Sequence, residues 1–343
     1  MISNLTHQVS IGFSSKAALQ GETTLYKSWR LGFQDAGRTH GEAIVVLLLE
    51  SAEPLPQENG LLLQVYEAIR KGFGRDLLKR DIAKARMKRA IEAANALVLR
   101  ELANASDSMP PRISVLLAVF MPSGDAGYDV MIGHVGACRA FLRRGRKITP
   151  LTTPHTWGQD LVTEAHQENR ATDLISPGDE ENTDKYPYWR RPTRFLGTTR
   201  TVAVDFWRET SDAQASVNGA AEAVKLQRGD NILLCTSTLT ATGLQQRGER
   251  ITVQSPSTLA QQLIAQAALP GGDGAAAVAV GWSIRLRVVL LISTIALLLA
   301  GLAWVVLFRQ LFPPPTGSTS TVTAESPGAA PPTIAASAPS ATA

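Results

Sequence analysis

The sequence predicts an α+β domain in which antiparallel sheets pack together and are covered by helices. Apolar runs of strand length clearly outnumber amphipathic helical stretches. Several consecutive runs are separated only by short turns rich in Gly, Ser and Asp, which is typical of hairpins. The runs also do not alternate regularly with helical patterns, as they would in a parallel sheet.

The strands of the first half are the clearest elements. Val9–Phe13 and Leu25–Phe33 read as short strands, and Glu42–Glu50 is a continuous apolar run typical of a buried strand. The pattern predicts a hairpin from Ile113–Met121 and Tyr128–Gly136, joined by a turn that contains Pro, Ser, Gly and Asp.

Two helical stretches lie between these strands. Leu61–Gly72 places its apolar residues on one face, and Phe73–Leu102 is long and helical in pattern. The apolar stripes in the two halves of Phe73–Leu102 do not align, so we expect a bend or break between them. Its many Lys and Arg residues are interpreted as solvated helix positions rather than as a nucleic-acid patch.

The remaining segments complete the α+β pattern. Pro154–Thr183 is polar and helical in its first half, and Ser257–Ala268 is an amphipathic helix. Further strands are predicted at Cys138–Arg143, Ile148–Leu151, Thr201–Trp207, Asn231–Thr236 and Gly274–Trp282.

Composition excludes several classes of protein. The 343 residues are 44% hydrophobic and 19% charged, an ordinary globular balance. The formal charge of +4 is spread along the chain, which argues against a nucleic-acid partner. Two cysteines, Cys138 and Cys235, form neither a disulfide framework nor a zinc-ligand spacing, and are expected to be reduced and buried.

The segment Val288–Phe308 carries no charge. Because about 20 apolar residues span the hydrocarbon core of a bilayer, it predicts a single transmembrane helix, within residues 284–311 with their basic flank. The alternative is a buried core helix. The sequence that follows, 312–343, is rich in Pro, Ser, Thr and Ala and is expected to be a disordered tail, which cannot cover such a helix.

The distribution of basic residues predicts the topology. Lys and Arg are frequent up to Arg287, whereas the tail beyond Arg309 has none. The positive-inside rule then places the domain 1–283 in the cytoplasm and the tail outside the cell membrane. The first 20 residues show no signal-peptide pattern, which agrees with this orientation.

Several segments resemble, in order, the protein phosphatase 2C family of PPM-type, metal-dependent Ser/Thr phosphatases. Val135–Leu142 with Gly145–Thr152 is similar to the family's "GDSRayL…dGk…LT.DH", and Thr193–Gly197 is similar to "ltraLG". Leu226–Leu239 is similar to "l.pGDrlLLCSDGL", and Gly271–Val280 takes the place of the closing "DNiTvvvv". Before residue 130 the resemblance rests on the order of strands and helices.

The resemblance implies a four-layer α-β-β-α sandwich of two antiparallel sheets over residues 1–283. It also implies a site for two Mn²⁺ or Mg²⁺ ions, normally bridged by aspartates. Two hard cations close together need several carboxylate oxygens, and they generate the hydroxide that attacks the phosphoester.

This chain departs from the family at most of those positions. Ser237 replaces the aspartate of "SDG", and Ala137 replaces that of "GDSR", which is not a core metal ligand. Near the N-terminus, Ala18 stands for the phosphate-binding Arg and Thr23 for a metal-binding Asp. A neutral side chain cannot replace a carboxylate ligand with comparable affinity.

Three carboxylates remain as candidate ligands. Asp273 occupies the closing "DN" position, followed by Gly274, and Glu22 is retained. Glu50 follows the strand where the family has "DGMGG". The alternatives are a turn aspartate for Asp273, and solvated side chains for Glu22 and Glu50.

The loss of ligands predicts a membrane-anchored pseudophosphatase without cofactor. Its expected partner is a Ser/Thr kinase or a phosphoprotein. Two alternatives stay open: an active phosphatase with Mn²⁺ or Mg²⁺ in a site rebuilt from Glu22, Glu50 and Asp273, and a structural or sensor subunit. His134 is interpreted as a packed strand residue, and His155 has no second His or Cys at ligand spacing.

Overall fold

The computed structural model describes residues 7–16, 22–36, 38–55, 60–104, 111–123, 127–167, 189–207, 223–239, 244, 255–266, 275–284, 294–295, 297–304 and 307. The chain divides into two compact units, Met1–Val289 and Leu290–Ala343. The described residues of the second unit are helical, at 294–295, 297–304 and 307.

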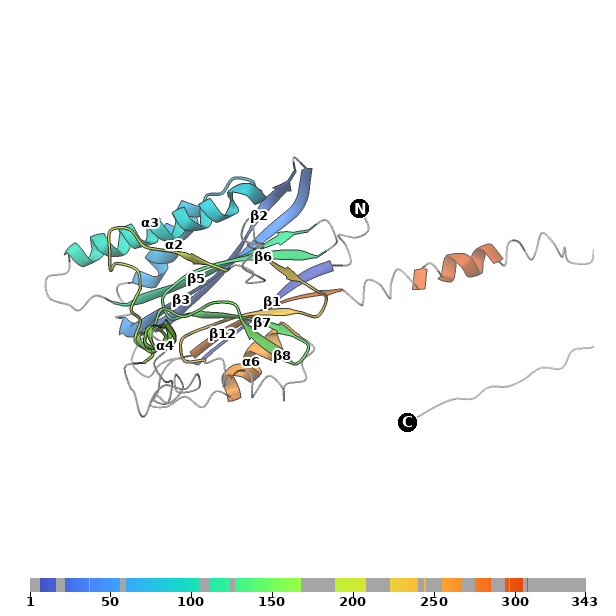
Figure 1. Ribbon diagram of the computed structural model, residues 1–343. Helices are drawn as coiled ribbons and strands as arrows, with labels where there is room; N and C mark the ends of the chain where they lie inside the picture. The colour runs from blue at the N-terminus through green and yellow to red at the C-terminus, as the bar shows by residue number, and fades with distance from the viewer. Residues whose placement is uncertain are drawn as a thin grey trace, which may run out of the picture. The chain divides into compact units, whose positions relative to one another are not determined.

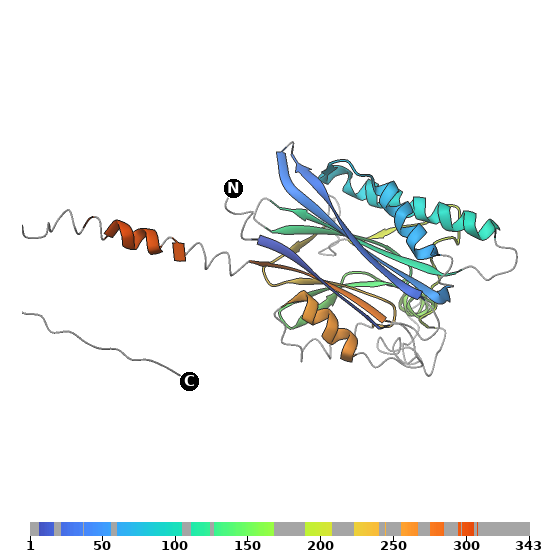
Figure 2. The ribbon, with the colours of Figure 1, turned by 180° about the vertical axis from the view of Figure 1, so that it is seen from behind.

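The first unit is a sandwich of two sheets (Figures 1 and 2). One sheet has the strand order β10-β6-β5-β3-β2-β4, with β9 beside β6. Its strands are β2 (Glu22–Asp35), β3 (Arg38–Leu55), β4 (Leu78–Lys79), β5 (Ile113–Pro122), β6 (Tyr128–Val135), β9 (Asp205–Phe206) and β10 (Val224–Leu226). The other has the order β1-β12-β11-β7-β8. Its strands are β1 (His7–Lys16), β7 (Arg139–Arg144), β8 (Lys147–Pro150), β11 (Asn231–Cys235) and β12 (Ala275–Ile284).

Helices cover both outer faces of this sandwich. Helices α2 (Leu61–Phe73) and α3 (Ala83–Asn104) lie on the seven-stranded sheet, and α6 (Pro256–Gln266) lies on the five-stranded sheet (Figure 2). Helix α4 (Trp157–Gln167) follows β8. The four-layer α-β-β-α arrangement expected from the resemblance is therefore confirmed.

Apolar cores lie between the layers, and alternate residues of β3 contribute to two of these cores. Val45, Leu47 and Leu49 pack toward α2 and α3, while the alternate residues Ile44, Val46 and Leu48 pack against the five-stranded sheet. Because successive strand residues point to opposite faces, a strand buried on both sides reads as a continuous apolar run. A third core lies under α6.

The first and last strands of the sandwich pair with each other. Strand β1 runs antiparallel to β12 over ten residue pairs, from His7–Ile284 to Lys16–Ala275. In the sheet order, β1 is an edge strand, and within the described residues it pairs only with β12. The five-stranded sheet is therefore assembled from both ends of the domain sequence.

Two expectations need correction. The seven-stranded sheet is not purely antiparallel, because β4 pairs with β2 in parallel through Phe33–Leu78 and Gln34–Lys79. The predicted helix Phe73–Leu102 is also wrong over its first third, since α2 ends at Phe73 and α3 begins at Ala83. The physical reason is Gly74, whose φ of 87° ends the helix.

The link between α2 and α3 is then fixed to the sheet. Leu78 is fully buried, and the short helix η2 (Arg80–Ile82) follows it. The Arg80 guanidinium donates hydrogen bonds to the carboxylates of Asp35 and Asp129, at 2.7 Å each. These anchors explain why Leu78 and Ile82 did not align with the apolar stripe of α3.

Within the described residues, no helix combines the length and the apolar character needed to cross a membrane. Residues 285–293, 296, 305–306 and 308–343 lie outside the described part of the chain. Much of the predicted transmembrane segment and the whole predicted tail are among them.

Candidate functional site

Strand β3 and the turn after β11 bring Glu50 and Ser237 together between the two sheets. Glu50 continues the alternation of Val46 and Leu48, so its side chain points toward the five-stranded sheet, and it is only 7% exposed. Ser237 lies in the turn after β11. Its hydroxyl donates a hydrogen bond of 2.6 Å to Glu50 Oε1, and its backbone N–H donates one of 2.9 Å to Oε2.

A third donor comes from the loop between β6 and β7. The Cys138 thiol donates to Glu50 Oε2 at 3.4 Å. The loop passes close to β5, where the Ala137 N–H donates to Ser114 Oγ at 3.0 Å. Gly136 permits this approach: its φ is 103°, and a Cβ there would lie 2.2 Å from Ser114 Oγ.

Burial sets the protonation of this site. Burial raises the pKa of the Glu50 carboxyl, and the hydrogen bonds from Ser237 and Cys138 and the charge of Arg139 oppose that rise. Burial, followed by the adjacent Glu50 carboxylate, raises the pKa of the Cys138 thiol. Cys138 therefore remains a protonated donor and not a thiolate ligand.

The structure places three of the predicted site residues in one region. Glu50 and Ser237 are in direct contact, and Ala137 is buried at 1% exposure one residue before Cys138. The interpretation of Glu50 as a solvated side chain is wrong. The expectation that Cys138 and Cys235 are free and buried is confirmed.

The other predicted positions are described partly or not at all. Ala18, Asp273 and Gly274 lie outside the described residues. Glu22 and Thr23 belong to β2, where Glu22 pairs with Leu55 and a register shift follows, but their side chains are outside the described part.

The described residues do not fit a pair of divalent cations. Both oxygens of Glu50 already accept hydrogen bonds, from an amide N–H, a hydroxyl and a thiol. Arg139, which is buried and lowers the pKa of Glu50, adds positive charge where a metal ion would need negative charge. Within the described residues, no group of three or more possible metal ligands includes Glu50.

A cluster of His134, His155 and Asp205 lies on the other side of the Gly136 loop. The two imidazole rings stack with centroids 4.6 Å apart. His155 Nδ1 accepts a hydrogen bond from the Gly136 N–H at 3.0 Å, so its proton is on Nε2, which donates to Asp205 Oδ2 at 2.7 Å. His134 Nε2 contacts the Thr153 carbonyl oxygen at 2.9 Å.

Both histidines are neutral in this arrangement. Burial lowers the pKa of His134 to about 4, and burial also lowers the pKa of His155 against the opposing effect of Asp205. Burial alone would raise the pKa of Asp205, but the His155 hydrogen bond and the Arg194 charge bring it below its ordinary value. The prediction that His134 is a packed strand residue is confirmed, since it is 3% exposed.

Two of the three possible metal ligands in this cluster, His155 and Asp205, are already engaged by neighbouring groups, whereas His134 Nδ1 is buried with no hydrogen-bond partner among the described residues. The three possible ligand atoms lie within 4.8 Å of one another. However, the Arg194 guanidinium is 3.0 Å from Asp205 Oδ1 and 3.1 Å from His155 Nε2, so a cation already occupies this position. Both ring nitrogens of His155 are engaged, which leaves none to accept a proton from a nucleophile.

Sequence reasoning did not identify Asp205 or Arg194. Asp205 lies in β9, a strand of two residues, and Arg194 lies in the loop before it. Neither belongs to a motif with ligand spacing. The only signal was the resemblance of Thr193–Gly197 to the family's "ltraLG" segment.

Comparisons with known proteins identify solved structures that share this fold. No protein-family model matches the chain, and no curated protein matches it. Among solved structures, the S. agalactiae serine/threonine phosphatase is similar to this chain, with a TM-score of 0.58 and 17% sequence identity. The matched region covers 80% of this chain and 99% of that one. The serine/threonine phosphatase Stp1 from Staphylococcus aureus is also similar, with a TM-score of 0.59 and 14% sequence identity. That match covers 80% of this chain and 95% of Stp1.

A third structure is the Mycobacterium tuberculosis serine/threonine phosphatase PstP/Ppp, at a TM-score of 0.53 and 16% identity, covering 80% of this chain and 98% of that one. At such identities the likeness shows the fold and not the chemistry. The layers and the connections between strands thus agree with what the motifs implied. The chain has the fold of the PPM-type, protein phosphatase 2C-like serine/threonine phosphatases.

Proposed function

We propose that this chain is a protein phosphatase 2C-like pseudophosphatase, which acts as a binding or regulatory module in Ser/Thr phosphorylation signalling. The observation that carries the proposal is the hydrogen bonding of Glu50. Its carboxylate, which the resemblance sets beside the family's "DGMGG" element, accepts hydrogen bonds from Ser237 and Cys138. Ser237 itself stands where the family has an acidic ligand.

The physical argument is that the groups around Glu50 are hydrogen-bond donors, whereas a metal site requires acceptors. A two-metal phosphatase site needs several carboxylate oxygens that compete for cations. Around Glu50, the neighbouring groups instead present N–H, O–H and S–H protons and a guanidinium charge. When bound, two metal ions would supply the attacking hydroxide, and the described residues offer no substitute for it.

The proposed partner is a Ser/Thr kinase or a phosphoprotein. The support is the fold, since solved structures that share it over about four-fifths of the chain are described as serine/threonine phosphatases. A domain that keeps the shape of such an enzyme without turnover would bind a partner and not release phosphate. We further propose that the cytoplasmic domain is anchored to the cell membrane through Val288–Phe308, supported by its uncharged sequence.

Metal binding and hydrolysis together test the first proposal. The full-length chain, purified in detergent micelles, is titrated with MnCl₂ by calorimetry and assayed with a phosphothreonine peptide. We expect no stoichiometric binding and no Mn²⁺-dependent release of phosphate. The enzyme alternative requires both, together with their loss in the Glu50→Gln variant, and that result would overturn the proposal.

Membrane fractionation tests the anchor. We expect the full-length chain to remain in the membrane pellet after an alkaline carbonate wash, and a chain that ends at residue 283 to be released. A full-length chain released by carbonate would contradict the anchoring proposal without affecting the conclusion on metal binding.

A further inference from the structure

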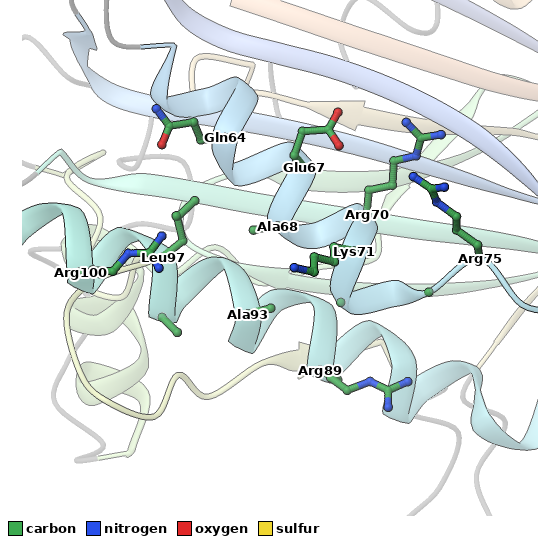
Figure 3. Close-up of a pocket in the computed structure, with 13 residues that line it drawn as sticks. Gln64, Glu67, Ala68, Arg70, Lys71, Arg75, Arg89, Ala93, Leu97 and Arg100 are labelled. Carbon is green, nitrogen blue, oxygen red and sulfur yellow. The ribbon is translucent and has the colours of Figure 1, made fainter.

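A groove runs between α2 and α3 on the outer side of the helical layer (Figure 3). Its volume is about 1210 Å³. The helices touch at one end, where a Cβ on Gly72 would lie 2.9 Å from Ala90 Cα and 3.0 Å from Ala93 Cβ. From this contact they diverge toward Gln64 on α2 and Arg100 on α3, which leaves the groove open at that end.

The rims of the groove are strongly basic. Of its charged lining residues, five are basic and one, Glu67, is acidic. The basic residues are Arg70, Lys71, Arg75, Arg89 and Arg100. Within the described residues, the ion pairs of these five are limited to that of Arg100 with Glu101, at 3.7 Å between exposed side chains. This positive charge is therefore largely without a neutralising partner in the part of the domain that the structure describes.

The floor of the groove is apolar and small. It is formed by Ala68, Gly72, Ala93, Ala96 and Leu97, of which Ala96 is exposed and Ala93 and Leu97 are half-buried. The sides of α2 and α3 that face the sheet belong to other residues, including Val65, Ile69, Met87 and Ala94. Of the groove residues, Leu97 also packs against the domain core, whereas Ala96 is exposed. Small side chains let another backbone approach closely.

We propose that this groove binds an acidic amphipathic helix of a partner protein. The lining of α3 from Arg89 to Arg100 spans about 16 Å at 1.5 Å per residue, which accommodates roughly three helical turns. Such a helix would place small apolar residues on the alanine floor and carboxylates beside the basic rims. The site lies on the opposite side of the seven-stranded sheet from Glu50, so the proposal does not depend on the fate of the metal site.

The shape and composition of the groove argue against two other negatively charged partners, a membrane surface and a single-stranded nucleic acid. A bilayer surface is flat, and its headgroups would meet the rims but not the floor between two helices. Single-stranded nucleic acid binds by stacking its bases on aromatic side chains, and the described residues that line the groove include no aromatic side chain. Both remain explicit outcomes of the test.

The probe is a fluorescein-labelled helical peptide of about three to four turns, with an Ala/Leu stripe flanked by Glu. Its binding to the full-length chain in detergent micelles is measured by fluorescence anisotropy at 0.15 M salt. We expect the Arg89→Glu, Arg100→Glu double variant to weaken binding by about tenfold or more, because attraction becomes repulsion. The Arg146→Glu, Lys147→Glu variant changes the net charge equally at an exposed hairpin turn, and is expected to change binding less than twofold.

A second variant distinguishes binding inside the groove from nonspecific attraction between opposite charges. Ala96→Trp keeps every charge but fills the floor, and we expect it to weaken the peptide about as much as the charge reversal. If Ala96→Trp binds the peptide normally, the proposal is overturned. It is equally overturned if phosphatidylserine vesicles or a single-stranded DNA bind more tightly than the peptide and lose binding in the Arg89→Glu, Arg100→Glu variant.

Discussion

The backbone N–H and the hydroxyl of Ser237 both donate to the buried carboxylate of Glu50, although the two residues are 187 positions apart in the sequence. The N–H contacts both carboxylate oxygens, and the hydroxyl contacts Oε1. The pair joins β3 to the turn after β11, and therefore joins the two sheets of the sandwich.

The hydroxyl of Ser237 should contribute measurably to stability. Ser237→Ala removes the 2.6 Å donor but keeps the backbone N–H, so Glu50 loses one bond in a buried setting. We expect a loss of about 1–3 kcal/mol in the free energy of unfolding, measured in urea. Ser15→Ala on the exposed edge of β1 is the control and should change it by less than about 0.5 kcal/mol. Equal effects from the two would show that the Glu50 bond is not a stabilising one.

Glu50 should make the domain less stable as the pH rises. Because burial raises its folded-state pKa above the ordinary 4.5, the folded protein holds this proton to higher pH than the unfolded chain does. The resulting stabilisation is complete below pH 4.5 and is lost as pH rises through the folded-state pKa. We therefore expect the Glu50→Gln variant to gain stability relative to the wild type with rising pH. Unfolding curves from pH 4.5 to 8 measure the difference, and a constant difference would refute the expectation.

His134 should produce the opposite dependence. Its folded-state pKa of about 4 lies below the ordinary 6.5, so the unfolded chain binds the proton first as the pH falls. Stability is then complete above pH 6.5 and decreases toward pH 4, by about 3 kcal/mol for this group.

The His134→Phe variant keeps a ring against His155 but cannot titrate. We expect its stability relative to the wild type to rise as the pH falls from 6.5 to 4, measured by thermal or urea unfolding. A His134 resonance that titrates near pH 6.5 in the folded protein, followed by NMR, would contradict the prediction.

Substitution by alanine should destabilise the domain far more at Gly136 than at Gly145, although both glycines have a positive φ. Gly136→Ala places a Cβ 2.2 Å from Ser114 Oγ and 2.8 Å from Ser114 Cα, in addition to the strain of its φ. Gly145→Ala, in the open turn between β7 and β8 with a φ of 62°, meets nothing within 4 Å. We expect a loss of about 1 kcal/mol at Gly145 and of more than about 2 kcal/mol at Gly136, by urea unfolding. Similar losses would mean that β5 yields to the new methyl group.

The strands of the core could be predicted from local pattern alone. The apolar run Glu42–Glu50 lies within β3, and Ile113–Met121 lies within β5. These strands are apolar on both faces, which the sequence displays directly. The break between α2 and α3 was only partly foreseen, because Leu78 owes its burial to pairing with β2 and not to a helical period.

The site could be predicted less well, because it depends on contacts between distant segments. Glu50 was expected to end its strand, but β3 continues to Leu55, and the burial of Glu50 and its bonds to Ser237 depend on how the two sheets stack. Similarly, His155 and Asp205 meet only because β9 pairs with β6 beside the Gly136 loop. Single polar residues in loops carry no periodicity from which such a meeting can be predicted.

The pairing of β1 with β12 has a consequence for biosynthesis. The ribosome makes residues 7–16 long before their partner strand, which is completed only at residue 284. At about 5–20 residues per second, β1 waits roughly 15–50 seconds for that partner. During this interval its apolar residues Val9 and Ile11 have no sheet to join. The nascent chain is therefore expected to need a holding chaperone until translation has passed the last strand.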